Sequence, residues 1–190
     1  MSAFLRPSVL PAPPLLTAEE FVQRYPNHRV ELVDGVVKEL EMPGFRHGKV
    51  CVRFSGFLFV YFQANDIGHL VSHDTSIKVR SDPDVVFGPD LAYFSYQRLA
   101  KGVEPQGMPG VLPELVAEVR SPSDVWTAVF AKVEEYLAAG VGVVIVLDPE
   151  KQSASVCRPG PVQTDFHVGD TLTIPDVLPG FAVPVAVLFE

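Results

Sequence analysis

The sequence has little cysteine, no long apolar run and no excess of positive charge. Cys51 and Cys157 are its two cysteines, too few for a disulfide framework and without the spacing of metal ligands. No segment reaches the roughly 18 consecutive apolar residues that a membrane-spanning helix needs. The proline-rich start over 1–14 lacks the zones of a signal peptide. We therefore expect a cytoplasmic protein that does not enter a membrane.

Acidic residues outnumber basic residues, with 23 Asp and Glu against 15 Lys and Arg and a formal net charge of −8. Proteins that coat nucleic acid use a broad basic surface, because contacts with phosphates drive that binding. The composition argues against a protein of this kind. It leaves open an enzyme that engages a few phosphates through metal ions, whose charge reverses the local field.

The length of 190 residues fits a single domain, and 47% hydrophobic residues are ordinary for a globular protein with a core. The segment Thr17-Ala-Glu-Glu20 has the pattern of a capping box and predicts the first helix. We therefore predict a proline-rich arm over 1–16 followed by one domain over 17–190.

Strand-forming and helix-forming segments follow one another along the rest of the chain. Asp34-Gly35 between two β-rich runs predicts a hairpin, and apolar spacings of three and four predict a helix over 46–63. A second helix is expected to start at Ser121 or Ser123 and to stop at Gly140. Further strands are expected at 69–79, 85–94, 114–120, 141–147, 153–157, 162–168 and 171–174. This order favours an α+β fold or a mixed α/β sheet with helices packed on it.

Two carboxylates stand in segments that are otherwise apolar and β-forming, Asp90 and Glu118. A buried carboxylate is costly unless it is paired or bound to a metal. Two of them on neighbouring strands would form an oxygen site suited to Mg²⁺ or Mn²⁺. The side chain of Val119 would point to the core, which leaves its backbone carbonyl free as a further ligand. An ion held there would serve phosphodiester hydrolysis by activating water and stabilising negative charge.

Structural roles for the same residues stay open. Asp90 follows a proline and could be a turn residue that starts a strand. Glu118 could form an ion pair with Arg120, which points to the same strand face two residues later. His47 near the start of the long helix could line a site, although local hydrogen bonds are the favoured interpretation.

Five short segments occur in a particular order along the chain. They are Glu31-Leu-Val-Asp-Gly, Pro89-Asp90, Glu118-Val-Arg-Ser-Pro-Ser, Lys132 followed by Tyr136, and Gly140-Val141 ahead of Val-Leu-Asp148-Pro149. In this order the sequence, from about residue 17 to 149, resembles the Uma-type restriction endonuclease family of the PD-(D/E)XK nuclease superfamily. The resemblance implies a restriction-endonuclease-like core, a mixed β-sheet flanked by helices, with a divalent metal at the edge of its central strands.

The resemblance also implies roles for single residues. Asp90 and Glu118 match the family's metal carboxylates, and Glu31 matches an accessory acid, although it could instead only pair with Arg29. Arg120 stands where the superfamily usually has lysine, and an arginine can clamp a phosphate but is a poor general base.

The family's lysine is then expected on the following helix, where Lys132 lies, although a helical lysine is more often solvated. With Asp90, Glu118 and the Val119 carbonyl as metal ligands, the sequence predicts a Mg²⁺- or Mn²⁺-dependent endonuclease. DNA is the substrate that the resemblance implies.

Cleavage of duplex DNA would suit a homodimer, because two strands need two active sites, and the apolar stretch 178–189 could contribute to its contact. One alternative is a non-catalytic module that binds metal, nucleic acid or a protein partner. Another is an enzyme that hydrolyses a different phosphoester at the same site.

Overall fold

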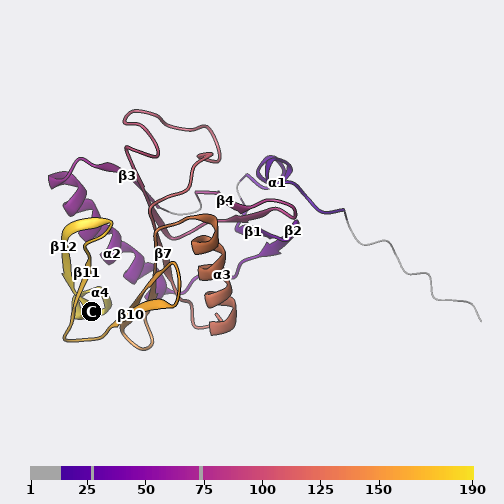
Figure 1. Ribbon diagram of the computed structural model, residues 1–190. Coiled ribbons are helices and arrows are strands. Elements are labelled where there is room, and N and C mark those ends of the chain that lie inside the picture. Colours follow the sequence, from indigo (N-terminus) through magenta and orange to yellow (C-terminus); the bar gives the residue numbers. More distant parts are fainter. Residues whose placement is uncertain (1–13, 27, 73–74) are drawn as a thin grey trace, which may run out of the picture.

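A mixed six-stranded sheet forms the centre of the protein (Figure 1), seen in a computed structural model that describes residues 14–26, 28–72 and 75–190. Its strand order is β10-β9-β8-β7-β6-β3. Only β7 and β8 run parallel, and every other neighbouring pair in this sheet is antiparallel. The strands are β3 (Gly68–Ser72), β6 (Leu91–Ser95), β7 (Leu115–Val119), β8 (Val143–Asp148), β9 (Ser153–Arg158) and β10 (Val162–Phe166).

A smaller sheet of order β2-β1-β5-β4 lies beside the first. It is formed by β1 (Val30–Val33), β2 (Val36–Glu39), β4 (Ile77–Arg80) and β5 (Val85–Phe87). The predicted hairpin is confirmed: β1 and β2 are antiparallel, and Asp34 and Gly35 between them both have positive φ, 54° and 72°. Two successive residues with positive φ are what a tight hairpin turn requires.

Two segments predicted as continuous strands are each divided between the sheets. Over 85–94, β5 belongs to the small sheet and β6 to the central one, with Pro89 between them. Proline lacks the N–H that a strand interior needs, so the prediction of one strand was wrong at this point. Over 69–79, β3 pairs with β6 whereas β4 pairs with β5, and residues 73–74 between them lie outside the described residues.

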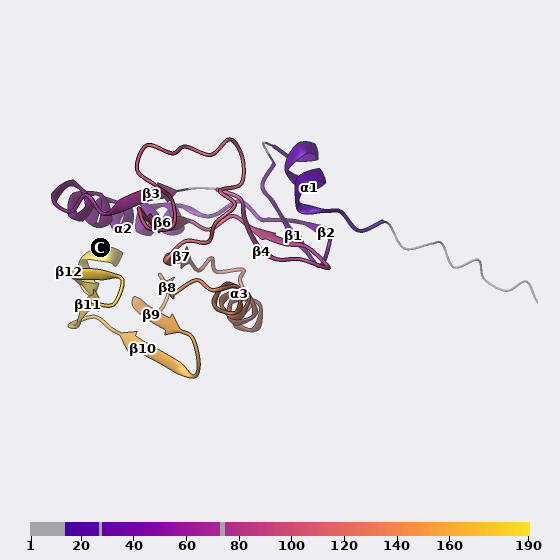
Figure 2. The same cartoon turned by 45° about the horizontal axis from the view of Figure 1, so that its top comes forward.

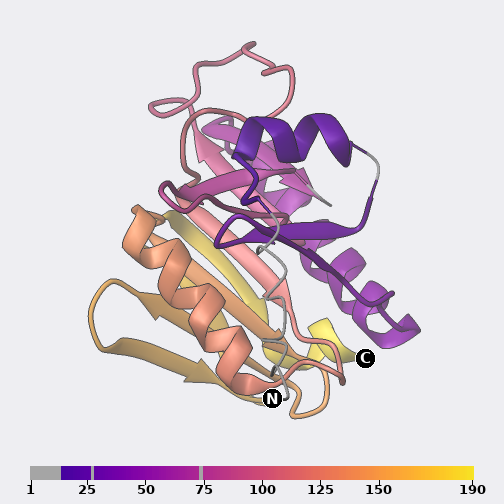
Figure 3. The same ribbon diagram turned by 90° about the vertical axis from the view of Figure 1, so that its right-hand side faces the viewer.

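Two helices cover opposite faces of the central sheet. The first, α2 (Phe45–Ala64), packs with its buried side chains against Leu115 and Ala117 of β7. The second, α3 (Trp126–Ala139), packs against Val116 between them, and Figure 3 shows it in front of the strands and running roughly along them. Successive strand residues point to opposite faces, which is why β7 serves both cores. The predicted mixed sheet flanked by helices is confirmed.

The ends of the helices test the predicted caps. Thr17 and Glu20 form the expected capping box of α1 (Ala18–Arg24), and Gly140 ends α3 in the left-handed conformation. The predicted start of α3 is wrong, because the helix begins at Trp126 and no serine caps it. The residues before it form a turn in which the Asp124 carboxylate accepts the N–H of Ser121 at 2.7 Å. A carboxylate is the stronger acceptor for this turn.

The C-terminal segment folds back onto α2. It contains β11 (Thr171–Ile174), β12 (Leu178–Pro184) and α4 (Val185–Phe189). Figures 1 and 2 show these elements at the opposite end of the molecule from α1 and the β1–β2 hairpin. Buried side chains along 178–189 belong to the core beneath α2. Most apolar side chains of this stretch, which was predicted to contribute to a dimer contact, therefore pack inside the protein and are not available for such a contact.

Two further predictions concern segments without regular structure and the membrane. The segment 101–113 contains no helix or strand, as predicted. Residues 1–13 of the predicted N-terminal arm over 1–16 lie outside the described residues. Among the helices in the described part of the chain, none is both long and apolar enough to cross a membrane.

Candidate active site

A cleft of about 310 Å³ opens where the small sheet meets the central sheet. Asp90 enters it from the crossing between β5 and β6, Glu118 from β7, and Lys132 from α3. His47, in the first turns of α2, lines it as well. Four segments that lie far apart in the sequence therefore contribute polar side chains to one cavity.

Lys132 is held between two acids. Its Nζ lies 2.6 Å from Oε1 of Glu31 and 2.9 Å from Oε1 of Glu118. Its side chain is 21% exposed, so the alternative of a solvated helical lysine is wrong. Burial works to lower the pKa of Lys132, but the charges of Glu118 and Glu31 outweigh it and raise that pKa above its usual range. The ammonium group therefore stays protonated and acts as a cation and hydrogen-bond donor.

Glu118 is the carboxylate with the most perturbed acidity in the cleft. Burial raises its pKa, the charges of Asp90 and Glu31 raise it further, and Lys132 opposes them, which leaves the pKa at about 7. The buried hydroxyl of Tyr136 donates to Oε1 of Glu118 at 2.9 Å. Like-charge crowding of this kind is typical of functional sites and is relieved by a bound cation.

Asp90 has a different environment, in which its charged form is favoured. Its Oδ2 accepts the backbone N–H of Val119 at 2.7 Å and lies 3.3 Å from Nε2 of His47. Burial works to raise the pKa of Asp90, but the hydrogen bond and charge of His47 and the Val119 N–H hold it below its usual range. The capping of a strand does not account for these contacts, which tie Asp90 to β7 and α2.

His47 makes a local hydrogen bond and also reaches the cleft. Its Nδ1 lies 3.4 Å from Sγ of Cys51, one turn later in α2, while its Nε2 faces Asp90. The potential ligand atoms of His47, Cys51 and Asp90 all lie within 4.8 Å of one another. Burial and the nearby Asp90 raise the pKa of the Cys51 thiol far above its usual range. A thiol must lose its proton to ligate a metal, so the oxygen donors of the cleft are better ligands than this group.

Arg120 lies apart from the cleft. Its Nη1 lies 2.7 Å from Oε2 of Glu150 and 3.2 Å from Oδ1 of the buried Asp148, and its guanidinium packs over the ring of Trp126. The sequence suggested an ion pair of Arg120 with Glu118 or a contact of Arg120 with phosphate. Among the described residues, Arg120 forms no ion pair with Glu118 and does not line the cleft. Val119 is as predicted, with its side chain buried in the core.

Three residues at or beside the cleft were not assigned a role in it from the sequence. Tyr136 was quoted only as the residue that follows Lys132 in the family's order, and for His47 local hydrogen bonds were favoured over a place in a site. Arg29 was considered as an alternative partner of Glu31, but it lines the cleft, and Glu31 binds Lys132. Tyr136 lies four residues after Lys132, and residues four apart share a helix face. This spacing could have predicted that Tyr136 lies beside Lys132 at the site.

Comparisons with known proteins agree with the fold and indicate the family. The chain matches the Uma2 family model, described as "Putative restriction endonuclease", over residues 18–186. Among solved structures it is similar to "a putative nuclease belonging to DUF820" from Anabaena variabilis, with a TM-score of 0.76 and 19% identity over 92% of this chain and 97% of that chain. At this identity the likeness concerns the fold, and it confirms the predicted restriction-endonuclease-like core. No curated protein matches the chain. Because the family model spans nearly all of its length, the chain belongs to the Uma2 restriction endonuclease family.

Proposed function

We propose that the protein is a Mg²⁺- or Mn²⁺-dependent endonuclease that hydrolyses phosphodiester bonds in DNA. The observation that carries the proposal is the placement of Lys132 at 2.9 Å from Glu118, in a cleft that Asp90 also lines. Two carboxylates with an adjacent fixed cation are what metal-assisted phosphodiester hydrolysis needs. Membership of a family described as restriction endonucleases supports this chemistry.

The donor set of the cleft suits a hard divalent cation. Asp90, Glu118 and the backbone carbonyl of Val119 would hold the ion through oxygen atoms, which Mg²⁺ and Mn²⁺ prefer. Burial and the charges of Asp90 and Glu31 raise the pKa of Glu118, and this supports such a fit, because an added positive charge would stabilise the carboxylate. A bound ion would supply an activated water and charge stabilisation at the phosphate.

The remaining roles, which are to orient water, neutralise charge and position the carboxylates, belong to side chains of the protein. Lys132 orients the attacking water and neutralises charge that develops on the phosphate, because its own raised pKa makes it a poor base. Glu31 holds Lys132 in place from the small sheet. Tyr136 fixes one oxygen of Glu118, and His47 fixes one oxygen of Asp90, so both carboxylates are preorganised.

The test combines metal binding with cleavage. Mn²⁺ binding is measured by calorimetry, and cleavage is measured on a closed circular DNA, which only an endonuclease can open. The native chain is compared with Asp90→Asn and Glu118→Gln. Asp66→Asn is the matched control, because Asp66 is exposed and pairs with Lys101 away from the cleft.

Loss of both Mn²⁺ binding and cleavage in the two cleft variants, with the control unchanged, is the expected result. Metal binding without hydrolysis by the native chain would instead favour the non-catalytic module. Cleavage that persists in both cleft variants would overturn the assignment of the site.

We also propose that the chain from 17 to 190 forms one domain. One buried cluster joins Val85 and Phe87 of the small sheet to Ala92 and Phe94 of the central sheet. Separate domains would each close their own core. If the protein acts on DNA, we place it in the cytoplasm, where its two free cysteines stay reduced.

We further propose a homodimer whose contact is the outer face of α2. Val52, Phe59 and Val60 on this helix are 70%, 59% and 68% exposed. Gly48 and Gly56 have open space beside them, which lets a second helix approach closely. A helix face of this kind can pack on its own copy about a twofold axis, and such a dimer would bring one active site to each strand of a duplex.

A further inference from the structure

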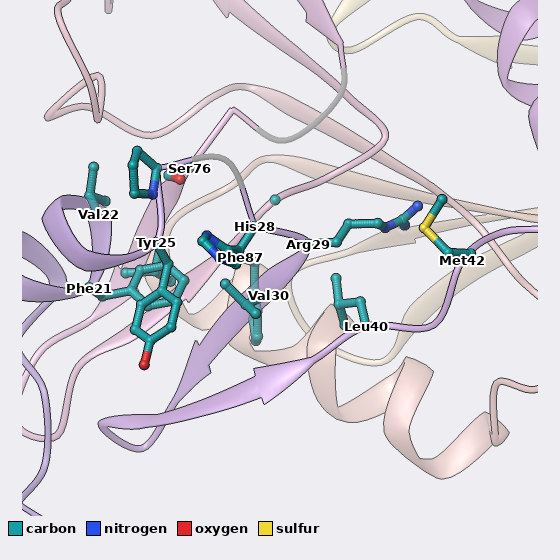
Figure 4. A pocket seen from close by; sticks show the side chains of 13 residues that line it. Phe21, Val22, Tyr25, His28, Arg29, Val30, Leu40, Met42, Ser76 and Phe87 are labelled. Carbon is teal, nitrogen blue, oxygen red and sulfur yellow. The ribbon is translucent and has the colours of Figure 1, made fainter.

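A second pocket of about 500 Å³ lies next to the catalytic cleft. It is enclosed by α1, the segment that leads into β1, the residues after β2, and β5 (Figure 4). Arg29, Leu40 and Gly88 line both cavities. The pocket therefore adjoins the site of proposed phosphodiester cleavage.

Aromatic side chains make up much of the pocket wall. Phe21 and Phe87 are buried, whereas Tyr25 is partly exposed and His28 is exposed. The ring of Tyr25 lies 5.9 Å from that of Phe21 and 5.6 Å from that of His28, measured between centroids. A pocket lined by two buried phenylalanines and two accessible aromatic rings suits a flat ring with polar atoms at its rim, and every nucleobase has this character.

Arg29 stands at the junction of the two cavities. In Figure 4 its side chain extends away from the aromatic residues, toward Met42. Its Nε is buried and has no hydrogen-bond partner among the described residues, and no ion pair of Arg29 is found there. Lys132, by contrast, is already bound to Glu31 and Glu118. A buried donor without an acceptor is costly, and Arg29 as a whole is only partly buried, so the remaining N–H groups of its guanidinium can bind an acceptor at the junction.

We infer that this pocket takes one unpaired nucleobase of the substrate strand, with Arg29 on the phosphate between that base and the bond to be cut. The inference rests on the proposed function and names its substrate class: single-stranded DNA, or duplex DNA from which one base is turned out. The pocket volume lies within the range of roughly 300 to 1,000 Å³ that is usual for small-ligand sites. Enzymes that turn a base out of the stack hold it between aromatic and apolar side chains in such a pocket.

The charge of the chain agrees with this mode of binding. A net charge of −8 gives little general attraction for phosphates, so affinity must come from local contacts. Stacking of a base on Tyr25 supplies such a contact and is independent of the sequence, because it uses the face of the ring. Arg29 then supplies the phosphate contact for which Arg120 lies in the wrong place.

The experiment removes the base and the aromatic ring separately. The full chain is mixed with Mn²⁺ and a labelled single-stranded oligonucleotide, and cleavage at each position is recorded. A series of oligonucleotides then carries one abasic nucleotide at successive positions. Each is tested with the native chain, Tyr25→Ala, Arg29→Gln and the control Tyr96→Ala, whose side chain binds Asp66 away from both cavities.

We expect one abasic position, next to the cut, to lower cleavage by the native chain about tenfold, the size of one lost stacking contact. Tyr25→Ala should lose a similar factor on the intact strand and should be insensitive to the abasic nucleotide. Tyr96→Ala should behave as the native chain does. This pairing of a protein change with a substrate change would not arise from a variant that merely folds poorly.

Two results would overturn the inference and are distinguishable from failure of the proposed function. If the native chain cleaves all abasic strands equally, the pocket does not hold a base, although the nuclease assignment stands. If Tyr25→Ala is slower yet remains sensitive to the abasic position, the base is held elsewhere. If the native chain neither binds nor cleaves any DNA, the proposed function itself fails and the inference falls with it.

Discussion

The ammonium group of Lys132 lies 2.6 Å from the carboxylate of Glu31, although 101 residues separate the two in the chain. Glu31 belongs to the small sheet, and Lys132 belongs to the helix that covers the central sheet. The pair therefore joins the two sheets at the cleft and holds the cation beside Glu118. Loss of Lys132 would leave the Glu31 carboxylate buried without its cationic partner, whereas loss of Glu31 would leave Lys132 paired with Glu118 alone.

Substitution of this lysine tests its role directly. Lys132→Met should lower the rate of DNA cleavage by about 10²- to 10⁴-fold, because the cation that orients water and neutralises charge is removed. It should also lower the free energy of unfolding by on the order of 2 kcal/mol, since Glu31 and Glu118 lose their partner. Single-turnover cleavage and denaturant unfolding measure the two effects.

The matched control for this prediction is Lys101→Met. Lys101 pairs with Asp66 at the surface, where an ion pair contributes little to stability. Neither the cleavage rate nor the unfolding free energy should change much in the control. An Lys132→Met variant that cleaves DNA as fast as the native chain would refute the catalytic role of Lys132.

The sequence was sufficient to single out two acids that meet in one cleft and insufficient to predict the partners of the cleft residues. Asp90 and Glu118 were identified because a carboxylate in an apolar strand is costly, and they do meet in one cleft. For Glu31 the sequence offered Arg29, two residues away, as an alternative partner, but its partner is Lys132, far along the chain. Local spacing shows which residues share a face, whereas contacts between distant segments depend on how the sheets pack.

The predicted boundaries of helices and strands were wrong where the local sequence was compatible with two different structures. The run over 85–94 has strand-forming residues throughout, but Pro89 lets the chain cross from one sheet to the other and so positions Asp90 at the cleft. Before α3, Ser121 and Ser123 are good caps, yet the carboxylate of Asp124 forms the turn, and Arg120 donates to the Asp124 carbonyl at 3.4 Å. Side chains outside the local pattern decided the outcome in both cases.

The proposed homodimer predicts a change of mass in solution. Phe59→Asp should convert the protein from dimer to monomer, because a charge on the outer face of α2 would be buried without a partner in the contact. Light scattering coupled to size-exclusion chromatography measures this mass. Val168→Asp, at a similarly exposed apolar residue far along the chain, is the control and should leave the dimer intact. A native protein that is monomeric at all concentrations tested would refute the proposed contact.

The Asp84 carboxylate predicts a pH-dependent part of the stability. Its Oδ2 accepts the N–H of Ala18 at 2.6 Å and lies 2.9 Å from Nζ of Lys78. Burial works to raise the pKa of Asp84, but Lys78 and the Ala18 N–H outweigh it and lower that pKa. A group with a lowered pKa in the folded state stabilises the protein above its unfolded pKa of about 4, and this stability is lost as pH falls.

Asp84→Asn should therefore lower the free energy of unfolding by about 1 kcal/mol near neutral pH. The difference from the native chain should shrink as pH falls below about 4, because the native carboxyl then takes up its proton as well. Urea unfolding of both proteins across this pH range measures the difference. A difference that stays constant down to the lowest pH would show that the ionised carboxylate is not the source of the stability.

Arg120 provides a test between the role implied by the family resemblance and the role indicated by its contacts. Its guanidinium binds the buried Asp148 and the more exposed Glu150. Arg120→Met should lower the free energy of unfolding by on the order of 3 kcal/mol, since it leaves a buried carboxylate unpaired. The unfolding free energy of Arg120→Lys should fall between that of Arg120→Met and that of the native chain, because lysine keeps the charge but cannot reproduce the planar set of donors.

Under conditions where both Arg120 variants are folded, calorimetric Mn²⁺ binding should match that of the native chain, because Asp90 and Glu118 are untouched. Loss of cleavage with unchanged stability would instead return Arg120 to the phosphate-binding role expected from the sequence.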